Sequence, residues 1–277
     1  MRYGIRNITL KVITHTLLMF AALTMLIPFL WMLSSSFKSL GEVFVFPPQL
    51  FGERLVWENY TQITARFDYF AYFRNSLKVS AWVVFFQLMT SATAGYVFAK
   101  LNFRGRDKFF LLYLATMMIP FHITVITNFL QMSRYGLVNT LWSLMLPASV
   151  SAFGTFLMRQ FFMTVPNELI EAAKIDGCNP LTTFIRIAFP MAKPTIATLS
   201  IFSFMHVWND FFTPLVYIHD IRFYTLPLGL AMLSGMFSTD WPVLMAASVV
   251  ATLPVLIAFL FAQDLFVKGV MLSGIKE

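Results

Sequence analysis

The chain has 277 residues, of which 58% are hydrophobic and 12% charged, and its formal net charge is +7. An ordinary soluble domain is about one quarter charged, so this composition argues against a soluble protein and points to a membrane protein. The single cysteine excludes an intrachain disulfide and a cysteine-based zinc site, and the absence of GxxxxGK[ST] excludes a P-loop in this chain. We interpret the net positive charge as a sign of membrane topology, in which Lys and Arg residues gather on one side, and we expect no nucleic-acid partner.

Long charge-poor runs predict the membrane spans. A membrane helix needs about 20 apolar residues to cross the hydrocarbon core. Runs of that length occur six times, at 12–37, 79–99, 109–133, 135–158, 194–219 and 241–263. A seventh run, 223–239, is shorter and contains Pro227, Gly229 and Gly235, so we expect an external or partly buried loop there.

The distribution of basic residues predicts the orientation. With the N-terminus inside, 13 of the 20 Lys and Arg residues fall on the cytoplasmic side, which the positive-inside rule favours. Both termini are then cytoplasmic. The charged segment from Glu168 to Pro180 lies on the same side, after the fourth span.

This charged segment has its own helical pattern. Pro166 suits a first helical turn, and Gly177 can adopt the left-handed conformation that ends a helix. Asn179 is a good N-cap and Pro180 a good first residue, so a second short helix is expected, ending at Pro190. The sequence therefore predicts a helix, a sharp turn and another helix.

The second short helix carries an apolar stripe with helical spacing, made of Leu181, Phe184, Ile185 and Ala188. One interpretation is that the stripe packs on the protein's own helices or on lipid. The other is that the two helices form a knob that fits a groove on another protein. The two short helices around a glycine favour the knob.

The stretch ELIEAAKIDGCNPLTTFIRIAFPMAKP resembles the EAA loop of ABC importer permeases. The matching residues are Glu171, Ala172, Ala173, Gly177, Pro190 and Pro194. Further stretches, among them FRGR, GLVNTLWSLMLP, WNDFFTPL and the tail FVKGVMLSGIKE, resemble the carbohydrate-uptake branch, whose type is the second permease subunit of maltose importers. The resemblance covers almost the whole chain.

The resemblance implies an all-α membrane protein with six transmembrane helices, the type I ABC importer permease fold and both termini in the cytoplasm. It implies residues 1–70 as the first helix and an external loop, residues 71–266 as the transmembrane domain with the EAA loop at about 160–194, and residues 267–277 as a cytoplasmic tail. The expected location is a bacterial or archaeal plasma membrane.

The resemblance also implies partners. A second permease subunit forms the other half of the pathway, two cytoplasmic ATPase subunits bind ATP and Mg, and an extracytoplasmic solute-binding protein delivers a carbohydrate. The chain itself is then no enzyme and has no catalytic residue, metal or cofactor. The external loop 38–78, stiffened by Pro47 and Pro48, is expected to contact the binding protein or act as a lid; simple packing is the alternative.

In such permeases the EAA loop sits in a cleft of the ATPase. The residues implied for this coupling are Glu168, Glu171, Ala172, Ala173, Asp176, Gly177, Phe184 and Pro190. Glu171 is expected to bond the ATPase groove, and Gly177 to set the angle between the short helices. Asp176 is expected to cap a helix or pair across the contact.

Five residues have chemistry suited to a sugar pathway: Asn128, Gln131, Trp208, Asn209 and Asp210. Amides bond hydroxyl groups and an aromatic face stacks on a sugar ring, but aromatic residues are also common at helix contacts. Asp210 is the carboxylate within a predicted span. Its position toward the external side favours a partly hydrated structural role over sugar contact.

Two other classes of protein fit the sequence less well. An ion-coupled secondary sugar transporter would carry inverted repeats and intramembrane acids, and the sequence offers no repeat and one peripheral acid. A membrane enzyme would need paired catalytic groups near the inner helix ends, and none are visible.

Overall fold

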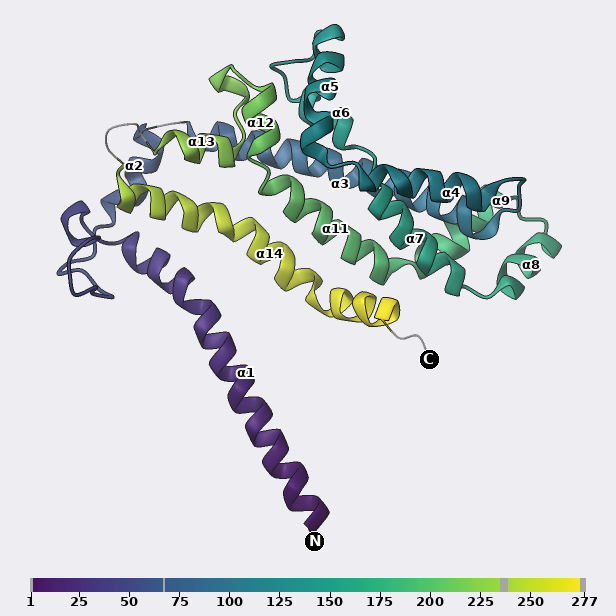
Figure 1. Cartoon of the computed structure of the whole chain (residues 1–277), viewed down its shortest axis with the longest axis horizontal. Helices are drawn as coiled ribbons and strands as arrows, with labels where there is room; N and C mark the ends of the chain where they lie inside the picture. The colour runs from purple at the N-terminus through teal and green to yellow at the C-terminus, as the bar shows by residue number, and fades with distance from the viewer. Residues whose placement is uncertain (1, 67, 235–238, 275–277) are drawn as a thin grey trace. The chain divides into compact units, whose positions relative to one another are not determined.

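The computed structural model describes residues 2–66, 68–234 and 239–274, with side chains for 10–65, 68–234 and 239–263. The side chains of the predicted tail 267–277 and residues 235–238 of the predicted loop lie outside this description. Apart from one isolated bridge between Ser234 and Thr239, the regular structure of these residues is helical (Figure 1). The chain divides into two compact units, 1–68 with 230–252, and 69–229 with 253–277.

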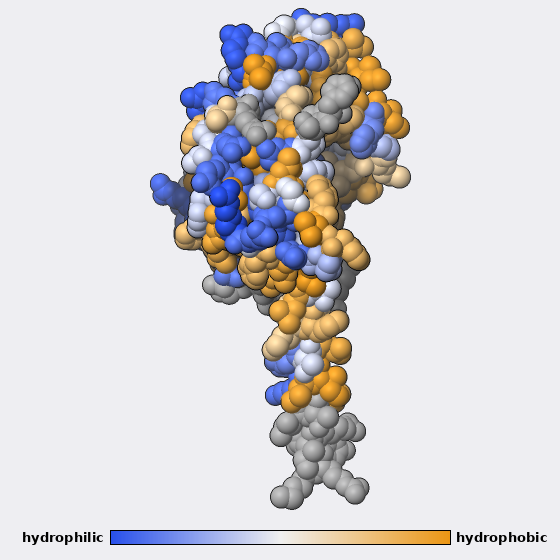
Figure 2. Space-filling view, turned by 90° about the vertical axis from the view of Figure 1, so that its left-hand side faces the viewer, coloured by the Kyte–Doolittle hydropathy of each residue, from blue (hydrophilic) through white to orange (hydrophobic). Residues whose placement is uncertain are grey.

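The first unit is built from α1 (Arg2–Ser35), the short η1 (Leu40–Glu42), α2 (Glu58–Arg66) and the start of α14 (Trp241–Gly274). Apolar side chains predominate on α1, the lower column of Figure 2. The chain after α1 is held by polar contacts: the Asn59 amide donates to the carbonyls of Ser36 and Lys38, both at 2.9 Å. Lys38 is buried, with its ammonium 4.3 Å from the Trp31 ring centre. The first part of the predicted external loop is therefore ordered around α1.

The second unit is organised around α3 (Tyr69–Lys100). Two helices pack along it, α7 (Ala152–Thr164) and α11 (Lys193–Trp208) (Figure 1). The remaining helices of this part are α4 (Arg106–Ala115), η2 (Thr116–Met118), α5 (Phe121–Arg134), α6 (Trp142–Ala148), α8 (Asn167–Ile175), α9 (Pro180–Thr183), η3 (Phe184–Ala188), α10 (Phe189–Met191), α12 (Phe212–Tyr217), η4 (Ile221–Phe223) and α13 (Leu226–Met232). Three long elements thus form a scaffold that carries several short ones.

Three unbroken helices of the described chain are long and apolar enough to cross a membrane, namely Leu10–Ser35, Tyr69–Lys100 and Trp241–Gln263. Two further candidates are bent pairs: Arg106–Met118 with Phe121–Arg134, at 97°, and Pro180–Met191 with Lys193–Trp208, at 78°. The first bend falls at Pro120, which has no N–H to continue the preceding helix. The third predicted run is therefore bent. The 78° bend precedes the fifth predicted run, 194–219, which is instead broken between Trp208, where α11 ends, and Phe212, where α12 begins.

The fourth predicted run, 135–158, is not one helix: α6 ends at Ala148 and α7 begins at Ala152. Backbone carbonyls freed in an apolar region need other donors. The Gln87 amide donates to Ala148 O at 2.7 Å, and the Thr90 hydroxyl donates to Ser149 O at 3.2 Å. Side chains of α3 thus satisfy the backbone where the run breaks, which the charge-free pattern of the run does not reveal.

Candidate functional site

The predicted knob exists as two short helices joined by a sharp turn, and we call α8, residues 176–179, α9 and the η3 turn (Phe184–Ala188) that continues α9 the elbow. Gly177 has φ +81°, the left-handed region that favours glycine. The Cys178 N–H donates to Ala173 O at 2.9 Å, and the Gly177 N–H donates to Lys174 O at 3.0 Å. These two bonds form a Schellman motif, which ends α8 at the predicted glycine.

The second helix of the elbow starts as predicted. Asn179 Oδ1 accepts from the Thr182 N–H at 2.8 Å, and Pro180 occupies the first turn. Pro166 differs slightly from the prediction, because it is the N-cap of α8 and not part of its first turn. The other predicted features of the turn, namely the stop at Gly177, the Asn179 cap and Pro180 as first residue, are confirmed.

The predicted end of the second helix at Pro190 is wrong by one residue, since helical structure continues through α10 to Met191. The five residues before α10 form a π-helix, η3, in which the Phe189 N–H bonds Phe184 O. A wider π turn accommodates a missing N–H and relieves the clash of a proline ring with the preceding turn. Pro190 is therefore tolerated inside the element.

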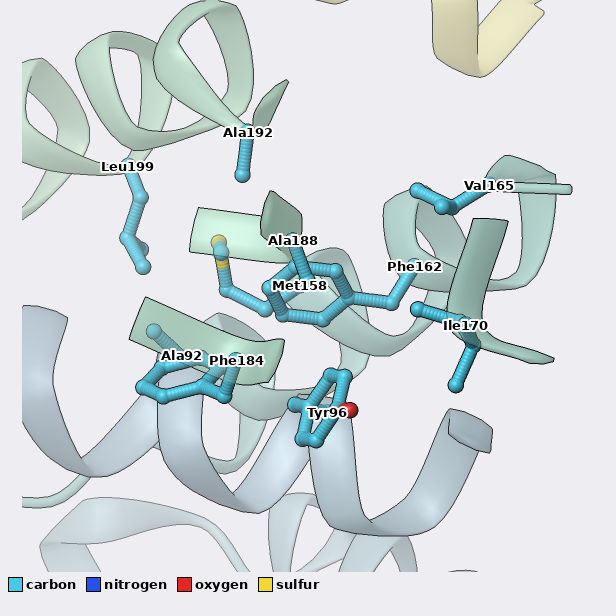
Figure 3. Packing of buried hydrophobic residues seen from close by; sticks show 10 residues of the cluster. All are labelled: Ala92, Tyr96, Met158, Phe162, Val165, Ile170, Phe184, Ala188, Ala192 and Leu199. Carbon is cyan, nitrogen blue, oxygen red and sulfur yellow. The ribbon is translucent and has the colours of Figure 1, made fainter. Parts of the chain in front are cut away.

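One side of the elbow is anchored in a hydrophobic core (Figure 3). Ile170 of α8, with Phe184 and Ala188 of η3, is buried there. The Phe184 ring centre lies 5.1 Å from that of Tyr96 on α3 and 6.2 Å from that of Phe162 on α7. This side of the elbow is therefore packed directly on α3 and α7.

A polar contact fixes the start of α8. Lys100, the last residue of α3, donates from its ammonium to the Asn167 side-chain carbonyl at 2.7 Å and to the Val165 carbonyl. The sequence-based reasoning used Lys100 only for orientation. The sequence signal for this contact is a basic residue at the C-terminal end of a long predicted helix, because such a residue can bond nearby backbone carbonyls.

The implied coupling residues divide into two groups. Those exposed on the elbow or close after it are Glu168, Glu171, Ala172, Asp176, Gly177 and Pro190. Ala173 and Phe184 are 3% and 8% exposed, so their side chains are buried within this chain. The direction in which each side chain points depends on the packing, which the spacing in the sequence does not specify.

The apolar stripe of the second helix is split in the same way. Phe184 and Ala188 point into the core, whereas Leu181 is 63% and Ile185 is 55% exposed. The sequence-based reasoning missed Ile175, the last residue of α8, which is 87% exposed. An isoleucine directly before a predicted glycine stop was the available signal. The elbow thus presents acidic and apolar side chains together.

The five sugar-pathway candidates lie in two segments of the chain, three at and directly after the end of α11 and two on α5. Trp208 is 2% exposed, and its ring packs against Phe204 and Phe73, both with centres at 5.4 Å. The Asn209 amide donates to Met205 O at 2.9 Å, and Asp210 Oδ1 accepts from the Thr213 N–H at 3.1 Å. These contacts lie at the C-terminal end of α11 and in the first turn of α12.

The other two candidates, Asn128 and Gln131, lie three residues apart on α5, so they share one face of that helix. Gln131 is exposed and Asn128 is half-buried. Their role in a sugar pathway stays a prediction.

A comparison with solved structures identifies the fold. A chain from the crystal structure of a bacterial ABC transporter involved in the import of the acidic polysaccharide alginate superposes with a TM-score of 0.81, at 24% identity, over 92% of this chain and 95% of that one. The shared feature is the ABC importer permease fold.

The sequence comparison identifies the family. Residues 91–271 match the model of the binding-protein-dependent transport system inner membrane component, and the chain belongs to this family. It is 38% identical over 208 residues to the arabinooligosaccharides transport system permease protein AraQ of Halalkalibacterium halodurans, covering 75% of each chain. It is 31% identical over 265 residues to the lactose transport system permease protein LacG of Rhizobium radiobacter, covering 96% of each.

Proposed function

We propose that this chain is one permease subunit of an ATP-driven, binding-protein-dependent importer of a di- or oligosaccharide or related sugar compound, and that it forms half of the translocation pathway. The observation that carries the proposal is the elbow, whose exposed face is acidic and apolar and whose buried face is locked into the core of α3 and α7. The family supports dependence on a binding protein. The arabinooligosaccharides and lactose for which AraQ and LacG are named support a carbohydrate.

The proposed topology has six crossings with both termini in the cytoplasm. It is supported by three unbroken candidate helices, two bent pairs and the broken run through α6 and α7. The transmembrane domain is proposed for residues 71–266, with 1–70 before it and the tail 267–277 after it. The proposed location is the plasma membrane of a bacterium or archaeon.

In the proposed mechanism, two partner ATPases hold ATP and Mg, and this chain and a second permease subunit hold the pathway. Closure of the ATPases moves the elbow. Glu171 bonds the ATPase groove, while the exposed Leu181 and Ile185 bury apolar surface in it. Buried Phe184 carries the displacement to α3 and α7.

The test reconstitutes this chain with its ATPase, second permease and binding protein in proteoliposomes. Sugar uptake is expected to require ATP and to persist when the proton gradient is collapsed. Uptake that follows the proton gradient and ignores ATP would instead establish the ion-coupled secondary transporter.

A matched pair of variants tests the elbow. Glu171→Gln should weaken co-purification of the ATPase, because a charged hydrogen bond across the contact is lost. Glu58→Gln removes an exposed carboxylate from α2 and should leave co-purification unchanged. If both variants retain the ATPase equally, Glu171 does not make the proposed contact.

A further inference from the structure

A second polar site lies away from the elbow, in the turn between α3 and α4. A cavity of about 350 Å³ is lined there by Asn102, Phe103, Gly105, Arg106, Asp107 and Lys108. Gly105 shapes the turn, since its φ is +87° and its carbonyl accepts from the Phe109 N–H at 2.9 Å. The coupling mechanism uses none of these side chains.

The charges of this turn favour an anion. Arg104, Arg106 and Lys108 lie within five residues, with Asp107 as the acid among them. That carboxylate is already engaged, because its Oδ1 accepts from the Arg159 guanidinium at 2.9 Å and from Arg106 Nε at 3.4 Å. The Arg159 side chain is 13% exposed, and its guanidinium lies 4.0 Å from the Phe110 ring centre. The charge of the Asp107 carboxylate is therefore paired with an arginine that is itself held in place.

Arg106 is also positioned. Its Nη1 donates to Asn102 Oδ1 at 3.2 Å, and its side chain is 28% exposed, so the guanidinium is held at the edge of the cavity. A guanidinium held in this way matches the oxygen geometry of a phosphate. Lys108, two residues further along α4, also lines the cavity, is exposed and supplies a second cation.

The apolar surface beside the cavity distinguishes a lipid from a free ion. Phe109, Leu111 and Leu112 of α4 are 59%, 65% and 69% exposed. The cavity lies at the end of the candidate span that begins at Arg106, where phosphate headgroups meet the hydrocarbon. A phospholipid therefore finds cations for its headgroup and apolar side chains for its acyl chains.

We infer that the α3–α4 turn binds an anionic phospholipid, with Arg106 and Lys108 on the headgroup phosphate and the exposed apolar side chains of α4 along the acyl chains. This site requires α3 and α4 to lie in a membrane, and it is independent of the transport reaction. Its failure and the failure of the proposed function are therefore distinguishable.

The experiment uses the full chain in its transporter, reconstituted in nanodiscs of phosphatidylcholine with phosphatidylglycerol. Lipid retained after detergent extraction is identified by native mass spectrometry. Phosphatidylglycerol retention is expected to weaken about 5-fold in Lys108→Gln and about 25-fold in Arg106→Gln/Lys108→Gln, because each surface cation near an anionic headgroup contributes to binding. Phosphatidylcholine retention is expected to stay unchanged.

The control is Arg134→Gln, which removes one exposed cation from the end of α5. It should retain phosphatidylglycerol like the natural chain. Equal retention by the double variant, or equal loss in Arg134→Gln, overturns the site. Displacement of the lipid by inorganic phosphate alone overturns the assignment to a lipid, because the site would then recognise a free anion. Lys108 is exposed, so its single variant reports binding without disturbing the fold.

Discussion

Gly95 of α3 lies directly against Met158 of α7: a Cβ placed on residue 95 would be 2.7 Å from the Met158 Cβ and 2.8 Å from the Arg159 backbone nitrogen. Because these are backbone-bound atoms, no side-chain rotation can make room. The two helices that receive the elbow therefore approach each other as closely as a missing side chain allows, which is a common way for helices to associate in membranes.

Gly95→Ala is expected to destabilise the protein by about 1–3 kcal/mol, because overpacking forces α3 and α7 apart. The measurement is thermal unfolding of the purified chain in detergent. Gly41→Ala is the matched control, since a Cβ at Gly41 meets nothing within 4 Å. Equal melting temperatures for both variants would show that the two helices can separate without cost.

Gln87→Leu is expected to cost about 0.5–2 kcal/mol of stability, in the range found for polar contacts between membrane helices. Gln87 is 8% exposed; it donates to Ala148 O, and its Oε1 accepts from the Ser203 hydroxyl at 2.6 Å. The change leaves both groups without this partner. Thermal unfolding measures the loss, and Gln131→Leu, at an exposed position, should show little of it. A stable Gln87→Leu protein would mean that water replaces the glutamine.

Gly177→Val is expected to let ATP hydrolysis proceed with little sugar uptake. A β-branched residue at φ +81° costs about 1–2 kcal/mol, so the turn reshapes and the angle of the elbow changes. No atom lies within 4 Å of a Cβ there, so the effect is conformational and not a clash. The measurement is the ratio of sugar transported to ATP hydrolysed.

Gly136→Val is the control for Gly177→Val. Gly136 has φ +67° and equally open surroundings, but it follows α5 and is not part of the elbow. Its variant should carry the same backbone strain and keep the transport ratio. Equal uncoupling by both variants would remove the special role of the elbow.

Cys178, the single cysteine of the chain, follows Gly177 in the elbow and is partly exposed. A membrane-impermeant maleimide is expected to label it in inside-out vesicles and not in intact cells, because the elbow is proposed to face the cytoplasm. Bound ATPase should slow the labelling. Cys178→Ser provides the unlabelled control, and labelling from outside would contradict the orientation.

The Asp220–Arg222 pair is expected to stabilise the start of η4 in a pH-dependent way. Hydrogen bonds from the Arg222 side chain and backbone N–H lower the pKa of Asp220 to about 2. Because the folded pKa is lowered, the stabilisation is present above the ordinary carboxyl pKa of about 4 and is lost as the pH falls toward about 2.

An NMR titration of the Asp220 carboxyl checks this pKa. In Arg222→Gln the main donor is removed, so the midpoint should rise toward about 4. An unchanged midpoint would show that the arginine does not set the pKa.

The local parts of the elbow could be predicted because their causes are local. Gly177, Asn179 and Pro180 act on the backbone within four residues, and the structure has the predicted stop, cap and first turn at these positions. The helix breaks at Ala148 and Asn209 could not be predicted in this way. A charge-free run specifies an apolar environment. Whether the run forms one unbroken helix depends on side chains that bond the backbone at a break, such as the donor Gln87 and the acceptor Asp210.

From the sequence alone follow the apolar class of the chain, most of its long helices and the conformation of the elbow, because hydropathy, spacing and backbone preference are properties of neighbouring residues. Only the tertiary structure decided that Phe184 and Ile170 anchor the elbow while Leu181, Ile185 and Ile175 face outward. The physical reason is that burial depends on which distant surfaces meet. Here Tyr96 and Phe162 cover one side of the elbow and leave its other side exposed.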